Sequence, residues 1–164
     1  MKFQRINFYP TNFAQVDGFL LRSSQPSREE LHYIKQQQLL TDIVNLSNNC
    51  PKKALEQEKL AAKELGINYF EIPSVTDKPT QKNIELFLGK TIQLKKNPNA
   101  KMLVHCNAGV DRTGTYVVFY QLFNKLKSFK EAIEEMKEMG HYPEFHKGLL
   151  EEISKIAKNM RLIK

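Results

Sequence analysis

The sequence contains no tryptophan and only two cysteines, Cys50 and Cys106, among its 164 residues. Two thiols are too few for a disulfide-stabilised scaffold or for a four-thiolate zinc site. The opening segment MKFQRINFYPTNF has no apolar core of the kind that a secretion signal needs. We therefore expect a reduced, cytoplasmic protein.

Long hydrophobic runs are also missing. The longest apolar stretch, Tyr116 to Phe123, is interrupted by Gln121 and is far shorter than the roughly 20 residues that cross a bilayer. The formal net charge is +7, from 25 basic and 18 acidic side chains, but no polybasic tail or lysine run concentrates it. We expect no integral membrane segment and no nucleic-acid partner.

Metal-ligand patterns are scarce as well. His32, His141 and His146 are scattered along the chain, and no Cys/His spacing typical of a structural zinc site is present. We therefore expect neither a metal nor a cofactor.

Two kinds of apolar segment alternate along the chain. Short β-branched or aromatic runs predict strands at residues 19–22, 41–46, 67–72 and 101–105. Apolar residues at helical spacing predict helices at 27–38, 52–65, from Thr80 or Asn83 to 94, from about Thr113, at 129–139 and at 145–163. This alternation is typical of an α/β fold with a central, largely parallel sheet of four to five strands flanked by helices. No linker or repeat divides the chain, so we expect a single domain over residues 1–164.

The segment from Val104 to Gly114 carries the clearest chemical signal. It places a thiol, Cys106, at the end of a predicted buried strand, a glycine in the following loop, and Arg112 at the opening of a helix. A helix N-terminus and a nearby cation both stabilise a thiolate. The backbone N–H groups of such a loop can converge on a tetrahedral oxyanion such as phosphate. Gly109 permits the tight curvature, and the arginine fork can hold two phosphate oxygens.

These residues form a His-Cys-x5-Arg-Thr signature, and the chain resembles the cysteine-dependent phosphatases, in particular the small dual-specificity and tyrosine phosphatases. The segments GFLLRSSQPS, at residues 18–27, and TDIVNLS, at residues 41–47, are similar to the family as well. The resemblance covers residues 17–123 well. It implies a phosphatase-like fold and phosphomonoester hydrolysis through a cysteinyl-phosphate intermediate.

The resemblance also implies roles for individual residues. Cys106 is the nucleophile, Arg112 clamps the phosphate, Thr113 steadies the sulfur as a leaving group, and His105 orients the loop. The expected phosphate-binding residues are Cys106, Asn107, Ala108, Gly109, Val110, Asp111 and Arg112. Arg22 is either a surface cation or a brace for the loop.

Two aspartates compete for the role of general acid. The family places this residue on a loop some thirty residues before the cysteine, which makes Asp77 the first choice. Asp before Lys-Pro is also a common turn residue. Asp111, directly before the arginine, is similar to the Asp-Arg-Thr loops of phosphoinositide phosphatases and of some bacterial tyrosine phosphatases. It either assists the acid step or braces the loop.

The first choice of function is a protein tyrosine or dual-specificity phosphatase whose partner is a phosphorylated protein. The alternative is a phosphoinositide or inositol-phosphate phosphatase, which Asp111 supports and the absence of lysines from the loop opposes. Lys78, Arg22 and Arg28 are candidates to meet further phosphates. A third possibility, of another class, is a phosphate-binding pseudophosphatase module. Cys50 is a candidate redox partner that forms a disulfide with Cys106.

Overall fold

The computed structural model describes residues 8–164 as an α/β fold with one five-stranded sheet. The absence of a secretion signal was predicted partly from residues 1–7, which lie outside the described residues. The strands are β1 (Ala14–Gln15), β2 (Leu20–Ser23), β3 (Asp42–Asn45), β4 (Asn68–Glu71) and β5 (Met102–His105). Their order in the sheet is β1-β2-β5-β3-β4, and every neighbouring pair is parallel except β1 with β2. The predicted α/β class and largely parallel sheet are confirmed.

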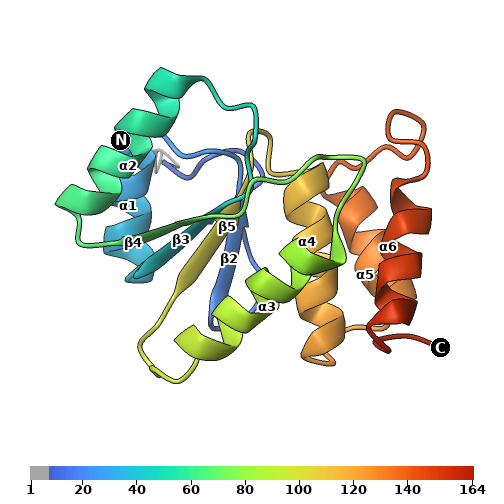
Figure 1. Cartoon of the computed structure of the whole chain (residues 1–164). Helices are drawn as coiled ribbons and strands as arrows, with labels where there is room; N and C mark the ends of the chain where they lie inside the picture. The colour runs from blue at the N-terminus through green and yellow to red at the C-terminus, as the bar shows by residue number, and fades with distance from the viewer. Residues whose placement is uncertain (1–7) are drawn as a thin grey trace, which may run out of the picture.

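Within residues 8–164, six helices lie on the two sides of this sheet (Figure 1). They are α1 (Arg28–Gln38), α2 (Lys52–Glu64), α3 (Gln81–Leu94), α4 (Asp111–Phe123), α5 (Phe129–Glu138) and α6 (Leu149–Asn159). Helices α1 and α2 lie on one face, and α3 to α6 lie on the other. Among residues 8–164, no helix is both long and apolar enough to cross a membrane.

The alternation of side chains between the two faces of each strand explains how one sheet supports two hydrophobic cores. Side chains on successive strand residues point to opposite faces. In β5, Leu103 packs with α1 and α2, whereas Met102 and Val104 pack with α3 to α6. The central strands are therefore apolar on both faces, as expected for a parallel sheet covered by helices.

The strand register determines where chemistry can occur. Ser23 of β2 and Asn45 of β3 both align with His105, the last residue of β5. The loops after these three strands therefore begin side by side at one edge of the sheet. In α/β folds this edge, at the carboxyl ends of the strands, is where ligands bind.

Helix boundaries follow the predicted signals in most places. Ser27 caps α1 through a capping box with Glu30, and Thr80 caps α3 by accepting a hydrogen bond from the Asn83 amide. Three local differences appear. Helix α4 begins at Asp111, two residues before the predicted Thr113. Strand β1 was not predicted, because two residues are too short to show a period.

The third difference concerns the last helix, which begins at Leu149 rather than at residue 145. Gly148 immediately before it has φ +87°, a left-handed conformation that interrupts a right-handed helix. Phe145 therefore lies in the connection after α5, where 77% of its surface is exposed. This connection lies close to the functional site, as described below.

Candidate active site

Cys106 directly follows β5, is 3% exposed, and lies in a loop that ends at the first residue of α4. The unpaired amides of the first helical turn and the helix dipole favour negative charge at this point. Thr113, in the first turn, donates its hydroxyl to Cys106 Sγ at 3.2 Å. The loop thus places the thiol at the N-terminal end of a helix, beside a hydroxyl donor.

Outward hydrogen bonds shape the loop. The carbonyls of Asn107, Ala108 and Gly109 accept from the Gln25 amide at 3.0 Å, from Asn12 Nδ2 at 2.8 Å and from Arg22 Nη2 at 2.8 Å. In a planar trans peptide the following N–H points opposite to the carbonyl. The amides of residues 108–110 therefore face the other side of the loop, as a phosphate cradle requires.

Gly109 makes the curvature possible. Its φ is +72°, and a Cβ built there would lie 2.4 Å from backbone atoms of Ser23 and Ser24. Any side chain would therefore collide with the end of β2.

Two buried arginines, Arg112 and Arg22, lie at the catalytic loop and make different contacts. Arg112 Nη1 donates to Asn48 Oδ1 at 2.8 Å, which fixes the guanidinium in position. Arg22 is 1% exposed and bonds the loop carbonyl, so it braces the loop. Burial lowers the pKa of Arg22, while Glu135 and Cys106 raise it. An arginine remains a cation even so.

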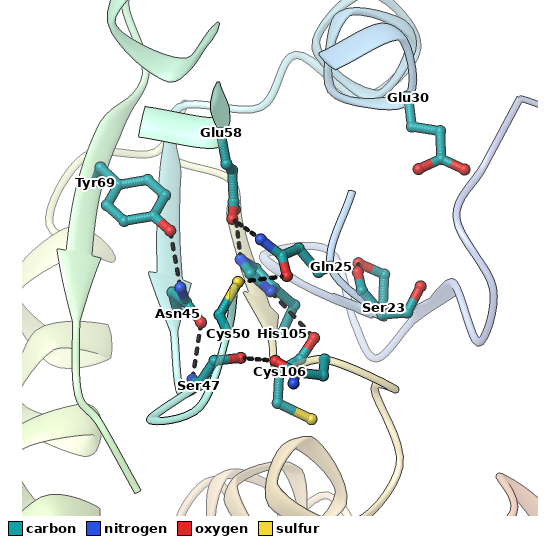
Figure 2. A network of polar contacts seen from close by, with 12 residues as sticks. Ser23, Gln25, Glu30, Asn45, Ser47, Cys50, Glu58, Tyr69, His105 and Cys106 are labelled. Atoms are coloured by element: carbon teal, nitrogen blue, oxygen red, sulfur yellow. Dashed lines mark hydrogen bonds and ion pairs between the residues drawn. The ribbon is translucent and has the colours of Figure 1, made fainter. Parts of the chain in front are cut away.

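A buried polar network lies behind the loop (Figure 2). His105 Nε2 is 2.6 Å from Glu58 Oε1, and both side chains are almost fully buried. Glu58 Oε2 accepts from Gln25 Nε2 at 3.1 Å, and His105 Nδ1 lies 3.3 Å from the Cys106 carbonyl. The contact between His105 Nε2 and Glu58 Oε1 is an ion-pair distance without hydrogen-bond geometry, so α2 supplies a buried carboxylate beside the imidazole ring. His105 thus lies between the buried carboxylate of α2 and the backbone of the loop, and its role in orienting the loop stays a prediction.

Cys50 belongs to the same network but does not contact Cys106. Its Sγ lies 2.9 Å from Gln25 Oε1, and both cysteines are free. Figure 2 shows the Cys50 sulfur directed toward Gln25, while the Cys106 sulfur lies on the side of α4. A disulfide between them requires Cys50 to leave Gln25, and it stays a prediction.

Both candidate acids lie at the opening of α4, joined by histidines. Asp111 Oδ1 is 2.7 Å from His141 Nδ1, and Asp111 Oδ2 is 3.1 Å from His146 Nε2. The other nitrogen of His146, Nδ1, is 2.6 Å from Asp77 Oδ1. The loop of Asp77 is held to α4 through the Ser74 hydroxyl, which lies 2.5 Å from the Tyr116 hydroxyl. The structure therefore brings Asp77 and Asp111 to one place instead of choosing between them.

Several of these side chains were not anticipated. Glu58 could have been found, because it occupies the apolar stripe of α2 beside Ala61 and Ala62. The pairing of His141 with His146 could not have been predicted from the sequence, because both residues lie in an irregular connection. Their rings stack 5.9 Å apart, although in sequence they look scattered. Within residues 8–164, no group of three or more His, Cys, Asp or Glu side chains is arranged to hold a metal ion.

The cations proposed for further phosphates are mostly engaged. Arg22 is buried, and Arg28 Nη2 forms a 2.7 Å ion pair with Glu64. Lys78, beside Asp77, is exposed. Of these three, Lys78 therefore stays the candidate cation for a further phosphate.

A thiol loop of this shape between a parallel strand and a helix, with a buried arginine in the first helical turn, defines a cysteine-dependent phosphatase. The chain belongs to the family described as "dual specificity phosphatase, catalytic domain", whose model matches residues 23–157. The predicted family is thereby confirmed.

Two relatives with a named activity are similar to this chain in sequence. The chain is 32% identical over 111 residues to the inositol diphosphatase SIW14 of Saccharomyces cerevisiae, covering 66% of this chain and 38% of the yeast protein. It is 30% identical over 108 residues to the inositol diphosphatase DSP3 of Arabidopsis thaliana, covering 66% of this chain and 52% of the plant protein. The chain thus matches about half or less of each relative's length.

The fold is shared with solved structures. The core catalytic domain of the S. cerevisiae PP-IP phosphatase SIW14 superposes with a TM-score of 0.66 at 23% identity, covering 95% of this chain and 96% of that one. At this identity the likeness concerns the fold alone.

Proposed function

We propose that this phosphatase removes phosphate from a multiply phosphorylated inositol, with a diphosphate group as its preferred target. The observation that carries the proposal is the sequence similarity to two inositol diphosphatases. The bond to be cleaved is either a phosphoester or a phosphoanhydride. In both cases the substrate presents a terminal phosphoryl group that fits the same loop. The loop chemistry therefore does not distinguish them, and the relatives favour the anhydride.

The protein phosphotyrosine substrate, which the sequence favoured first, becomes the second candidate. The family match is compatible with it, but the two named relatives act on inositol diphosphates. A phosphorylated protein partner therefore stays a prediction, as does the cytoplasmic location.

The arrangement of side chains supports a two-step mechanism. The Cys106 thiolate attacks phosphorus, while Arg112 and the amides of residues 108–110 hold the other phosphoryl oxygens. The bond to the leaving oxygen breaks, and a carboxyl group protonates that oxygen. Water then attacks the cysteinyl phosphate, and Thr113, 3.2 Å from Sγ, stabilises the sulfur as it departs.

A substrate panel tests the proposal. We expect kcat/KM for an inositol diphosphate to exceed that for a phosphotyrosine peptide, a phosphoserine peptide and a phosphoinositide by at least tenfold. Hydrolysis should persist in a metal chelator and disappear in Cys106→Ser. Cys50→Ser is the matched control, because it removes the other thiol. A preference for the phosphotyrosine peptide would overturn the inositol proposal while leaving the phosphatase class intact.

A binding module without turnover is the remaining class, and the same panel addresses it. Such a module would bind phosphate with equal affinity in wild type and Cys106→Ser, and neither would hydrolyse any compound. The hydroxyl of Thr113 on Sγ argues against it, because a binder needs no leaving-group stabilisation.

A further inference from the structure

The connection between α5 and α6 brings two histidines against both candidate acids. His146 contacts a carboxylate with each ring nitrogen, Nδ1 with Asp77 at 2.6 Å and Nε2 with Asp111 at 3.1 Å. His141 contacts the second oxygen of Asp111 at 2.7 Å. The titratable groups that face His146 thus come from the loop after β4, from α4 and from its own connection.

Proton counting constrains this cluster. The 2.6 Å contact of His146 Nδ1 with Asp77 Oδ1 is a hydrogen bond and needs one hydrogen atom between its heavy atoms. The 3.1 Å contact of Nε2 with Asp111 Oδ2 is an ion-pair distance, and it is attractive only if Nε2 carries a hydrogen atom as well. A neutral imidazole carries only one N–H, and an ionised carboxylate carries none. Asp77, His146 and Asp111 therefore share two protons, either as an imidazolium between two carboxylates or with one carboxyl protonated.

The two carboxyl groups are not equivalent. Asp111 has a histidine nitrogen against each oxygen, a hydrogen bond with buried His141 and an ion-pair contact with His146, and its side chain is 20% exposed. Asp77 has one histidine contact, and its side chain is 51% exposed. Asp111 is thus enclosed by two histidines, whereas Asp77 is the more exposed carboxyl group. The proton that can be given away is the one between His146 Nδ1 and Asp77 Oδ1.

We propose that His146 is a positioning residue that stores this proton against Asp77 and so makes Asp77, rather than Asp111, the general acid. The inference rests on the phosphatase class and not on the inositol substrate. Asp111 and His141 orient the His146 ring from behind. Asp77 is the more exposed of the two carboxyl groups and is therefore the one assigned to meet the leaving oxygen.

The proton balance follows from this arrangement. In the first step the sulfur–phosphorus bond forms, the phosphorus–oxygen bond breaks, and the shared proton goes through Asp77 to the leaving oxygen. The Asp77 carboxylate then faces an unprotonated Nδ1 at 2.6 Å, which is repulsive. In the second step it takes a proton from the attacking water, while the phosphorus–sulfur bond breaks and the electron pair returns to sulfur. The cluster regains its two protons.

Aryl phosphates with different leaving groups test the proposal. Loss of a general acid affects poor leaving groups most. In His146→Gln we expect kcat/KM for phenyl phosphate to fall roughly tenfold to a hundredfold, and for nitrophenyl phosphate less than about threefold. The loss should lie in kcat rather than in KM. The double variant with Asp77→Asn should be no slower than Asp77→Asn alone, because His146 acts through Asp77.

Two further variants complete the test. His32→Gln, on α1 beyond the opposite face of the sheet, is the matched histidine control and should leave both substrates unchanged. In His146→Ala, added imidazole should restore turnover of phenyl phosphate, which a merely structural loss would not allow. Equal losses on both substrates, an additive double variant, or absence of rescue would overturn the proposal. If Asp111→Asn instead of Asp77→Asn shows the leaving-group dependence, the acid is Asp111 and the assignment is wrong.

Discussion

At the residue scale, Glu58 links a surface helix to the catalytic loop. Its carboxylate is 2.6 Å from His105 Nε2 inside the protein, and His105 in turn lies against the Cys106 carbonyl. A buried charge of this kind is retained only where its partners are correctly placed. The free-energy cost of burying the Glu58 carboxylate is therefore offset only when His105 and Gln25 are in place.

Removing the charge of Glu58 should disturb both stability and the loop. We expect Glu58→Gln to lower the free energy of unfolding by about 1–3 kcal/mol, because a buried hydrogen-bonded charge is replaced by a weaker partner. Alkylation of Cys106 by iodoacetamide should also slow. Glu56→Gln on the same helix is the control, since its 3.9 Å pair with Lys52 is exposed. Equal behaviour of the two variants in urea unfolding and alkylation would show that the buried pair does not matter.

Substitution of Gly109 should affect both stability and phosphate binding. In Gly109→Ala the positive φ alone costs about 1–3 kcal/mol, and the collision with Ser23 and Ser24 adds to it. We expect a lower melting temperature and a loss of phosphate affinity by titration calorimetry. Gly18→Ala is the matched control, because a Cβ there has no atom within 4 Å. Unchanged phosphate binding in Gly109→Ala would mean that the loop tolerates a different curvature.

Cys50 is positioned for a redox test. After mild peroxide treatment we expect peptide mapping without reductant to show a Cys50–Cys106 bridge, since a thiolate is readily oxidised and then captured by a second thiol. Gln25→Ala should accelerate bridging, because it frees the Cys50 sulfur. Cys50→Ser should leave Cys106 oxidised to higher acids. The same higher oxidation in wild type, with no bridge, would rule the disulfide out.

At the scale of elements, the sequence predicted those features of helices and strands that depend on residues close together in the chain. The capping box at Ser27, the cap at Thr80 and the four predicted strands depend on nearby residues, and the sequence reveals them. The His-Cys-x5-Arg-Thr loop was equally evident, since its residues are contiguous. The start of α6 was misjudged because Phe145 continues an apolar pattern, whereas the left-handed Gly148 decides the boundary.

Contacts between distant elements could not be predicted in this way. Asn48 reaches Arg112 across 64 positions of sequence, and His146 reaches Asp77 across 69. Glu58 of helix α2 lies against His105 of strand β5. No local pattern encodes such pairs, because they depend on how loops and helices meet at the sheet edge. The chemistry was therefore predictable, but the groups that tune it were not.

At the scale of the whole molecule, Asp17 joins one end of the sheet to α4. Its carboxylate accepts from the Tyr120 hydroxyl at 2.6 Å and from the amides of Phe19 and Leu20 at 2.8 Å. Burial alone would raise the pKa of Asp17, but the hydrogen bonds and Lys95 hold it below its ordinary value of 3.8. The folded state thus binds the carboxylate form more tightly than the unfolded chain does.

This pKa shift predicts the pH dependence of stability. A lowered folded-state pKa contributes stability above about pH 4, and the contribution is lost as the pH falls through the folded-state value. We expect Asp17→Asn to lose up to about 1 kcal/mol at pH 7, after allowance for solvent screening. By urea unfolding, the difference from wild type should shrink toward pH 2–3. Glu144→Gln, which is exposed, should show no such trend. A difference that stays constant with pH would contradict the role of the Asp17 charge.

The position of β5 between β2 and β3 has a consequence for how the enzyme is made. The two strands that flank the catalytic loop are translated first, yet they are not neighbours and can be joined only when residues 102–105 emerge. Long-range parallel pairing of this kind forms late in folding. The nascent chain therefore has no assembled phosphate cradle until its central strand is inserted. The reactive thiol and the structure that activates it appear in the same step.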